Sequence, residues 1–108
     1  MNSTTWAALA DPHRRRMLES LQESPRAVGE LVAIVGLTQP GTSKHLRVLR
    51  DAGLVRASTE GQHRIYALEP GPLAELDAWL EPYRRQWEAS LDALERHLER
   101  KSSPTKEQ

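Results

Sequence analysis

Hydrophobic residues in the first third of the chain recur at the three- and four-residue spacings of amphipathic helices. The pattern predicts a short apolar helix over residues 4–10, a longer helix over residues 12–23 and a third helix over residues 28–35. Asp11 is a preferred N-cap residue for the second helix, and Gly36 is a preferred residue after the end of the third. The inward-facing positions of the two longer helices are Met17, Leu18, Leu21, Val28, Leu31, Val32 and Val35.

A fourth helix is predicted from residue 39 to a C-cap at Gly53, and its two faces differ in chemistry. Thr38 is suited to cap this helix, and Pro40 is tolerated in its unpaired first turn. Leu46 and Leu49 form an inward stripe. The outward face carries no carboxylate; its amide, hydroxyl and cationic groups belong to Gln39, Ser43, Lys44, Arg47 and Arg50. Such groups suit the DNA major groove, where base edges lie between rows of phosphates.

Two short segments that follow, residues 54–59 and 64–68, have strand character, and the turn over residues 60–63 predicts a hairpin. A hairpin directly after two helices joined by a short glycine-containing turn is typical of a winged helix-turn-helix. The predicted fold is therefore mainly α with a small β-hairpin wing, in the order α-α-α-α-β-β-α. The tip of the wing would bring three side chains to DNA phosphate or to the narrow groove: Gln62, His63 and Arg64.

The last predicted helix begins after Pro70-Gly71-Pro72 and runs to about Arg100. We expect Pro82 to kink or split it just before the proline. The polar residues 101–108 predict a disordered tail, so that one domain is expected over residues 1–100. Apolar residues follow this helix in steps of four and three, at Leu76, Leu80, Tyr83, Trp87, Leu91, Leu94 and Leu98.

A chain of 108 residues has little surface of its own left to cover this apolar stripe. We therefore expect the first and last helices to pair across a two-fold axis. Such a homodimer would place two recognition helices roughly 34 Å apart, about one DNA turn. The alternative is that the stripe packs only on its own domain. The predicted interface comprises Trp6, Leu9, Trp79, Tyr83, Trp87, Leu91 and Leu94.

The formal net charge is zero, which argues against a basic tail that wraps nucleic acid without sequence preference. Locally, residues 38–66 carry +3 and residues 69–100 carry −4, which places a positive face beside the polar helix. Solvated faces of mixed charge would also explain either half alone. The absence of cysteine excludes disulfides and thiolate metal sites. With no long apolar run and no signal segment, we expect a cytoplasmic protein without membrane contact.

Other chemistry finds little support in the sequence. The four histidines at positions 13, 45, 63 and 97 form no pair at the helical spacing of metal ligands, so we expect no metal and no cofactor. Ser43, His45 and Asp51 have the residue types of a hydrolytic triad. However, residues 43 and 45 point apart on one helix, so the nucleophile would not reach its base. We therefore predict that the chain is not an enzyme.

Several segments together resemble the ArsR-type winged helix-turn-helix repressors. They are residues 9–18, 28–31, 38–55 and 61–68, the third reading Thr-Gln-Pro-Gly-Thr-Ser-Lys-His-Leu-Arg-Val-Leu-Arg-Asp-Ala-Gly-Leu-Val. The resemblance covers about residues 5–98 and implies a dimeric DNA-binding repressor that a metal ion or another signal releases from its operator. The family's thiolate sites use cysteines in the helix over residues 28–35, which has none here. Its zinc-type sites use Asp and His pairs in the last helix, where only His97 is present.

The resemblance also implies roles for individual residues. Arg47 fits a phosphate contact, whereas His45 matches a characteristic family histidine for which a phosphate contact and a capping or packing role both remain open. Gly41 should cost about 0.5–1 kcal/mol relative to alanine, unless it permits close approach to the DNA backbone. The positions that match family DNA contacts, or lie on the same face, are Gln39, Pro40, Ser43 and Lys44.

We interpret the chain as a sequence-specific DNA-binding transcriptional regulator, a dimeric repressor of an imperfect inverted-repeat operator, with autoregulation as one option. The alternative is a winged-helix module for protein–protein contact without sequence-specific DNA binding. The expected partners are double-stranded DNA, a second copy of the chain, and an effector that is an unknown small molecule or protein.

Overall fold

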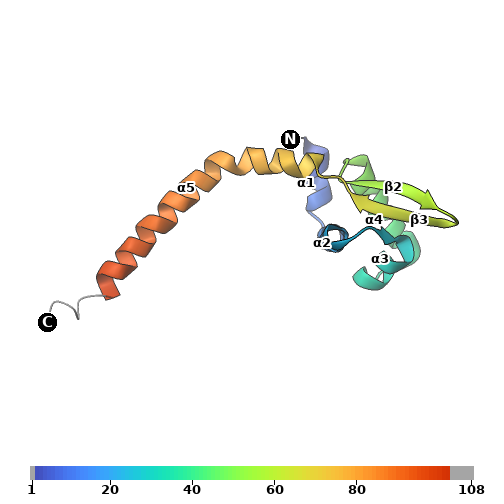
Figure 1. Ribbon diagram of the computed structural model, residues 1–108, viewed down its shortest axis with the longest axis horizontal. Coiled ribbons are helices and arrows are strands. Elements are labelled where there is room, and N and C mark those ends of the chain that lie inside the picture. The colour runs from blue at the N-terminus through green and yellow to red at the C-terminus, as the bar shows by residue number, and fades with distance from the viewer. Residues whose placement is uncertain (1, 103–108) are drawn as a thin grey trace. The chain divides into compact units, whose positions relative to one another are not determined.

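The computed structural model describes residues 2–102 and consists of helices with one small antiparallel sheet (Figure 1). Contacts divide the chain into two units, Met1–Leu76 and Asp77–Gln108, so the single domain expected over residues 1–100 stays a prediction. In chain order the elements are α1 (Ser3–Leu9), α2 (Pro12–Glu23), β1 (Arg26–Ala27), α3 (Val28–Val35), α4 (Gln39–Asp51), β2 (Val55–Glu60), β3 (His63–Leu68) and α5 (Gly71–Ser102).

The first two helices begin at polar caps. The side chain of Asn2 accepts from the backbone N–H of Thr5, and the carboxylate of Asp11 accepts from the N–H groups of His13 and Arg14. These bonds satisfy donors that a helix leaves free in its first turn. The α2 helix ends at Glu23, directly before Ser24, as the sequence predicted.

The helix pair α3 and α4 is joined by a turn of three residues, as the sequence predicted. Gly36 ends α3 with a positive φ of 71°, a conformation that costs little only for glycine. Thr38 then caps α4, because its hydroxyl accepts from the N–H of Gly41 at 3.1 Å. The turn therefore fixes where α4 starts relative to α3.

The core of the first unit lies between α1–α4 and the sheet. The inward-facing residues expected of α2, α3 and α4 contribute most of it, since Val35 and both leucines of α4 are buried. The largest side chains that lie fully inside are Met17, Leu31, Leu46, Leu49 and Leu54, with Thr42 as the polar member. Burial of one face of α4 leaves the other face in solvent.

The sheet has three strands in the order β1-β3-β2, one more than the expected hairpin. The extra strand, β1, pairs Arg26 with Tyr66 and Ala27 with Ile65. A strand of two residues is too short to produce an alternating pattern, so the sequence carries no signal for it. The hairpin itself is confirmed. Its turn is tighter than expected, because Glu60 and His63 already pair and only residues 61–62 remain between the strands.

The helix α5 passes through Pro82 without ending, so of the two expected effects of Pro82, a kink or a split, the split is excluded. Proline removes the hydrogen bond to the carbonyl of residue 78. The guanidinium group of Arg84 strengthens the same region, since it donates to both the carboxylate and the carbonyl of Asp77, at 2.6 and 2.7 Å, and to Glu81 at 2.8 Å.

The end of α5 corrects a second expectation. Lys101 and Ser102 belong to the helix rather than to a tail, and the rest of the expected tail, residues 103–108, lies outside the described residues. Within residues 2–102, no helix combines the length and the apolar character needed to cross a bilayer.

Candidate nucleic-acid interface

The outward face of α4 is open to solvent over its whole length. The side chains at positions 39, 40, 43, 44 and 47 are all exposed, while the opposite stripe at positions 42, 46 and 49 is buried. Five of the predicted DNA-binding residues thus share one accessible helix face: Gln39, Pro40, Ser43, Lys44 and Arg47. This face offers hydrogen-bond donors and acceptors, together with two cations, for contact with bases and phosphates.

Gly41 lies directly beside the hydroxyl group of Thr38 that caps its helix. A Cβ atom added at this position would lie 3.1 Å from the Thr38 hydroxyl oxygen, which caps the helix. A residue with a Cβ atom at position 41 would therefore require the Thr38 hydroxyl oxygen to shift by a few tenths of an ångström.

His45 lies on the flank of α4 that faces α2, and it is half-buried. Its Nδ1 atom lies 3.1 Å from a guanidinium nitrogen of Arg14, and its ring centroid lies 5.8 Å from that of His13. Of the two roles left open for His45, this geometry supports packing. A direct phosphate contact by His45 stays a prediction.

Arg14 makes further contacts that tie this flank together. Its Nε atom donates to the carbonyl of Ala8 at 2.8 Å, and a second nitrogen donates to the carbonyl of Ala7 at 2.9 Å. The desolvation of Asp11 raises its carboxyl pKa, but the N–H donors of Arg14 and His13 and the charges of His45 and Arg14 outweigh this effect and lower the pKa overall. The end of α1, the start of α2 and the middle of α4 are thus linked through one guanidinium group.

The wing places its three predicted contact residues in solvent. Gln62, His63 and Arg64 are all exposed, at the turn and at the start of β3. The guanidinium carbon of Arg64 lies 5.7 Å from the centroid of the Tyr66 ring, within the range of a cation–π contact. Arg56 on the neighbouring strand is instead ion-paired with Glu69.

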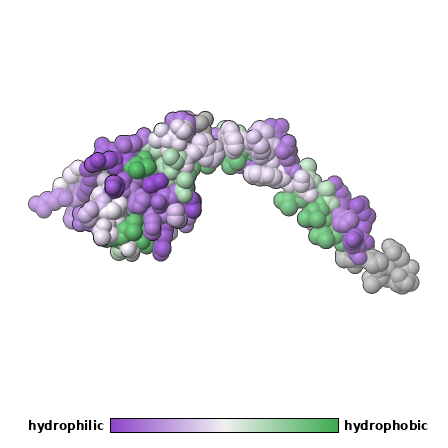
Figure 2. All heavy atoms as spheres, turned by 180° about the vertical axis from the view of Figure 1, so that it is seen from behind, coloured by the Kyte–Doolittle hydropathy of each residue, from purple (hydrophilic) through white to green (hydrophobic). Residues whose placement is uncertain are grey.

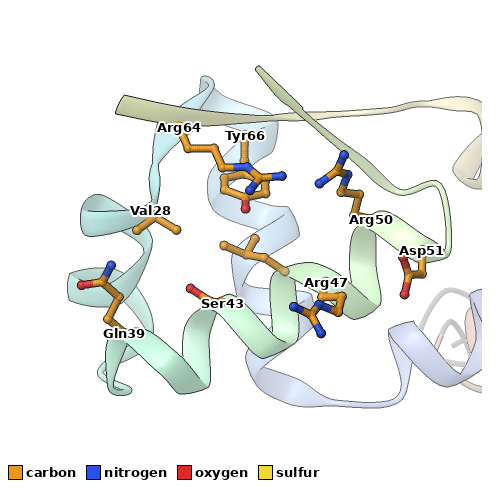
Figure 3. A pocket seen from close by; sticks show the side chains of 9 residues that line it. Val28, Gln39, Ser43, Arg47, Arg50, Asp51, Arg64 and Tyr66 are labelled. Atoms are coloured by element: carbon orange, nitrogen blue, oxygen red, sulfur yellow. The ribbon is translucent and has the colours of Figure 1, made fainter. Parts of the chain in front are cut away.

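A cavity of about 550 Å³ lies between α4 and β3 and connects the two predicted contact surfaces (Figure 3). From α4 it is lined by Gln39, Ser43, Arg47 and Arg50, and from β3 by Arg64 and Tyr66. Figure 3 shows Arg50 reaching from the helix and Arg64 from the strand into the same space, beside the Tyr66 ring.

Tyr66 was not among the predicted site residues, and Arg50 was predicted only as part of the outward face of the helix and not as a DNA contact. A usable signal for Arg50 was present, because residues 43, 47 and 50 follow one another at helical spacing on one face. For Tyr66 the signal is weaker: residues 64 and 66 share one face of a strand, but which face meets α4 depends on the packing.

The apolar stripe of α5 is exposed in the described chain, and Figure 2 shows apolar patches along this helix. Trp87 is 51% exposed and Leu91 63%, large fractions for such side chains. Trp79 and Tyr83 stack at a centroid distance of 5.0 Å. Among the other residues of the predicted interface, Trp6 and Leu94 are exposed and Leu9 is half-buried.

Titratable side chains do not gather into a metal site in the part of the chain that the structure describes. Within residues 2–102, no three histidine, aspartate or glutamate side chains are placed to hold one ion. The α3 helix, residues 28–35, contains one glutamate and otherwise apolar residues.

The chain is similar to a group of bacterial regulators. Residues 11–57 match the family described as "Bacterial regulatory protein, arsR family". The HTH-type transcriptional regulator Rv2034 of Mycobacterium tuberculosis is 42% identical over 86 residues, which cover 80% of this chain and 78% of that protein. The HTH-type transcriptional regulator CmtR of Mycobacterium bovis is 46% identical over 67 residues, which cover 62% of this chain and 57% of CmtR.

Solved structures agree with the sequence comparison. The crystal structure of an ArsR family transcriptional regulator superposes with a TM-score of 0.70 at 35% identity, covering 79% of this chain and 88% of the other. A solution structure from Mycobacterium bovis, described as a homodimeric winged helix-turn-helix DNA-binding domain, gives a TM-score of 0.64 at 27% identity and covers 78% of each chain.

Proposed function

From the premise that this chain belongs to the ArsR family of bacterial regulators, we propose that it is a dimeric repressor that binds an inverted-repeat operator. The family is one of DNA-binding transcriptional regulators with a winged helix-turn-helix fold, and not of enzymes. We expect this regulator to act in the cytoplasm, the compartment that holds bacterial DNA.

The single observation that carries the proposal is the exposed face of α4. It presents Gln39, Ser43, Lys44 and Arg47 to solvent with no carboxylate among them. Amide and hydroxyl groups can distinguish base edges, and the cations can hold the flanking phosphates. We propose that α4 is the recognition helix, and that the wing residues 62–64 contact the adjacent backbone or groove.

The apolar stripe of α5 supports the homodimer. Leucine and tryptophan side chains that are about half exposed favour burial against a matching surface, and a second copy of the chain supplies one. The relative described as homodimeric has the same fold. In a two-fold dimer, two copies of α4 separated by one DNA turn would match the two halves of a palindromic site.

The signal that ends repression is, we propose, not a thiolate-bound metal. The chain has no cysteine, and α3 offers no thiolate at the positions that such family sites use. The remaining effectors are a small molecule or a partner protein. Autorepression without an effector is the third possibility.

The experiment that tests the proposal is footprinting of the purified protein on the DNA upstream of its own gene, with random duplex as competitor. We expect one protected inverted repeat and an affinity for it about 10³-fold or more above that for random duplex. Equal affinity for all duplexes would instead favour a protein-contact module. Calorimetry with Zn²⁺ should show no binding, and a stoichiometric zinc signal would contradict the assignment of a metal-free regulator.

A further inference from the structure

Three arginines line the cavity between α4 and β3 without an ion-pair partner among the described residues. Among the residues that the structure describes, the guanidinium groups of Arg47, Arg50 and Arg64 form no ion pair. Elsewhere in the described chain, arginines that have acidic neighbours do pair with them: Arg26 with Glu23 and Glu30, Arg56 with Glu69, and Arg84 with Asp77 and Glu81.

The unpaired state of these three groups is significant because the chain as a whole has equal numbers of acids and bases. Only one carboxylate, that of Asp51, lines the same cavity, and it forms no ion pair with them. The cavity therefore holds a net charge of about +2. Cations gathered in a concave surface raise the local concentration of anions and repel one another until an anion binds.

The floor of the cavity is rigid. The Tyr66 side chain is only 6% exposed, and its backbone pairs with both neighbouring strands, opposite Arg26 and Ala57. The Arg64 guanidinium lies against this fixed ring at 5.7 Å. Such contact limits the conformations of a long side chain and lowers the entropy lost when it binds an anion.

We propose that the cavity is a phosphate-binding site in which Arg50 of α4 and Arg64 of the wing hold the same phosphate group. The site rests on the proposed DNA binding, in which the phosphate belongs to the strand that passes between the recognition helix and the wing. Arginine suits this role because its planar fork matches phosphate oxygens in bidentate geometry. Inorganic phosphate has the same chemistry and is the second source of the group.

Arg47 has a different position, since it also lines a second, adjacent groove on α4, with Pro40, Gly41, Ser43 and Lys44. It therefore faces both the cavity and the exposed face of the helix. Arg50 and Arg64, in contrast, line only the cavity, and they belong to different elements, α4 and β3.

The test measures how the operator affinity of the full chain depends on salt. Each neutralised phosphate contributes about 0.9 to the slope of log K against log salt concentration. If Arg50 and Arg64 share one phosphate, either single variant, Arg50→Gln or Arg64→Gln, weakens operator and random duplex alike but changes the slope little. The double variant loses about 0.9. If they held separate phosphates, each single variant would lose about 0.9 and the double about 1.8, and that result would overturn the proposal.

The matched control is Arg56→Gln, an exposed wing arginine that is already paired with Glu69 and should leave the slope unchanged. A second arm titrates inorganic phosphate and follows the Nε signals of Arg50 and Arg64 by NMR. Saturable shifts of both signals in the wild type, with weaker binding reported by the remaining arginine in each single variant, support the site even if the wild type shows no operator preference, an outcome that would defeat only the proposed function. No slope change in the double variant together with no phosphate shift overturns the site.

Discussion

A guanidinium nitrogen of Arg14 lies 3.1 Å from Nδ1 of His45, and this contact connects α2 to the middle of α4. Arginine has only donors, so Nδ1 is the acceptor of this hydrogen bond in the tautomer that carries its proton on Nε2. The same guanidinium group donates to two carbonyls at the end of α1. The placement of α4 therefore depends on a side chain that also closes the first helix.

We predict that Arg14→Gln lowers the free energy of unfolding by about 1–3 kcal/mol, because two carbonyls and one ring nitrogen lose a charged donor. It should also weaken operator binding, although the proposed interface does not include Arg14. Urea unfolding and a binding titration measure the two effects. The control is Arg16→Gln, because Arg16 is exposed on the same helix and forms no hydrogen bond within the described residues. Equal stability of the two variants would contradict a linking role for Arg14.

Base specificity should depend on the amide and hydroxyl groups of α4. We predict that Gln39→Ala and Ser43→Ala reduce the preference for operator over random duplex by about 1–3 kcal/mol each, while nonspecific binding changes little. Arg47→Ala should weaken both duplexes together and flatten the salt slope by about 0.9. Gln22→Ala, an exposed glutamine on α2, serves as the control. If these α4 variants all bound like the wild type, the recognition face would be wrongly assigned.

Dimerisation should fail when charge is placed on the apolar stripe. The double variant Trp87→Asp/Leu91→Asp would bury two carboxylates of each chain at the proposed interface. Burial of these charges without an ion-pair partner costs free energy and opposes association. We predict a monomer by sedimentation equilibrium and a loss of operator affinity of about a hundredfold, since the second half-site is no longer bound by the same molecule. Glu88→Gln on the same helix should remain dimeric. A wild-type protein that is already monomeric at micromolar concentration would contradict the dimer.

The cap at Asp11 makes part of the stability depend on pH. The folded chain lowers the pKa of this carboxyl below its ordinary value near 3.8, so the unfolded chain binds the proton more tightly. The stabilisation is therefore complete above about pH 4–5 and disappears as the pH falls through the folded pKa. Asn remains a good cap without a charge. We predict that the stability difference between wild type and Asp11→Asn, measured by urea unfolding, shrinks as the pH falls from 7 to 2. A difference independent of pH would contradict the shift.

Much of the site could be predicted because it is local in sequence. Thr38, Pro40 and the leucines at 46 and 49 define the start and the buried face of α4, so the exposed face follows from helix geometry alone. The hairpin follows in the same way from two β-forming segments and a glycine turn. These features need no knowledge of what packs against them.

The features that were missed depend on contacts between distant segments. Arg14 and His45 are 31 residues apart, and no spacing rule connects them. The shared cavity needs the packing of β3 on α4, and β1 needs a partner strand to exist at all. The sequence left open whether Pro82 kinks or splits α5, because the hydrogen bonds from Arg84 to Asp77 across this region cannot be read from the proline alone.

Tyr66 lies at the centre of a sheet in which both edges of β3 are already occupied, and this restricts how the wing can change during evolution. One residue added or lost between positions 63 and 66 would turn either Arg64 or Tyr66 to the opposite side of the sheet. Extra residues at positions 61–62 would leave every existing pair in place. Insertions in the wing are therefore tolerated only at the hairpin turn. A wing lengthened there would reach further along the DNA, while the strand pairing and the core of the first unit stay unchanged.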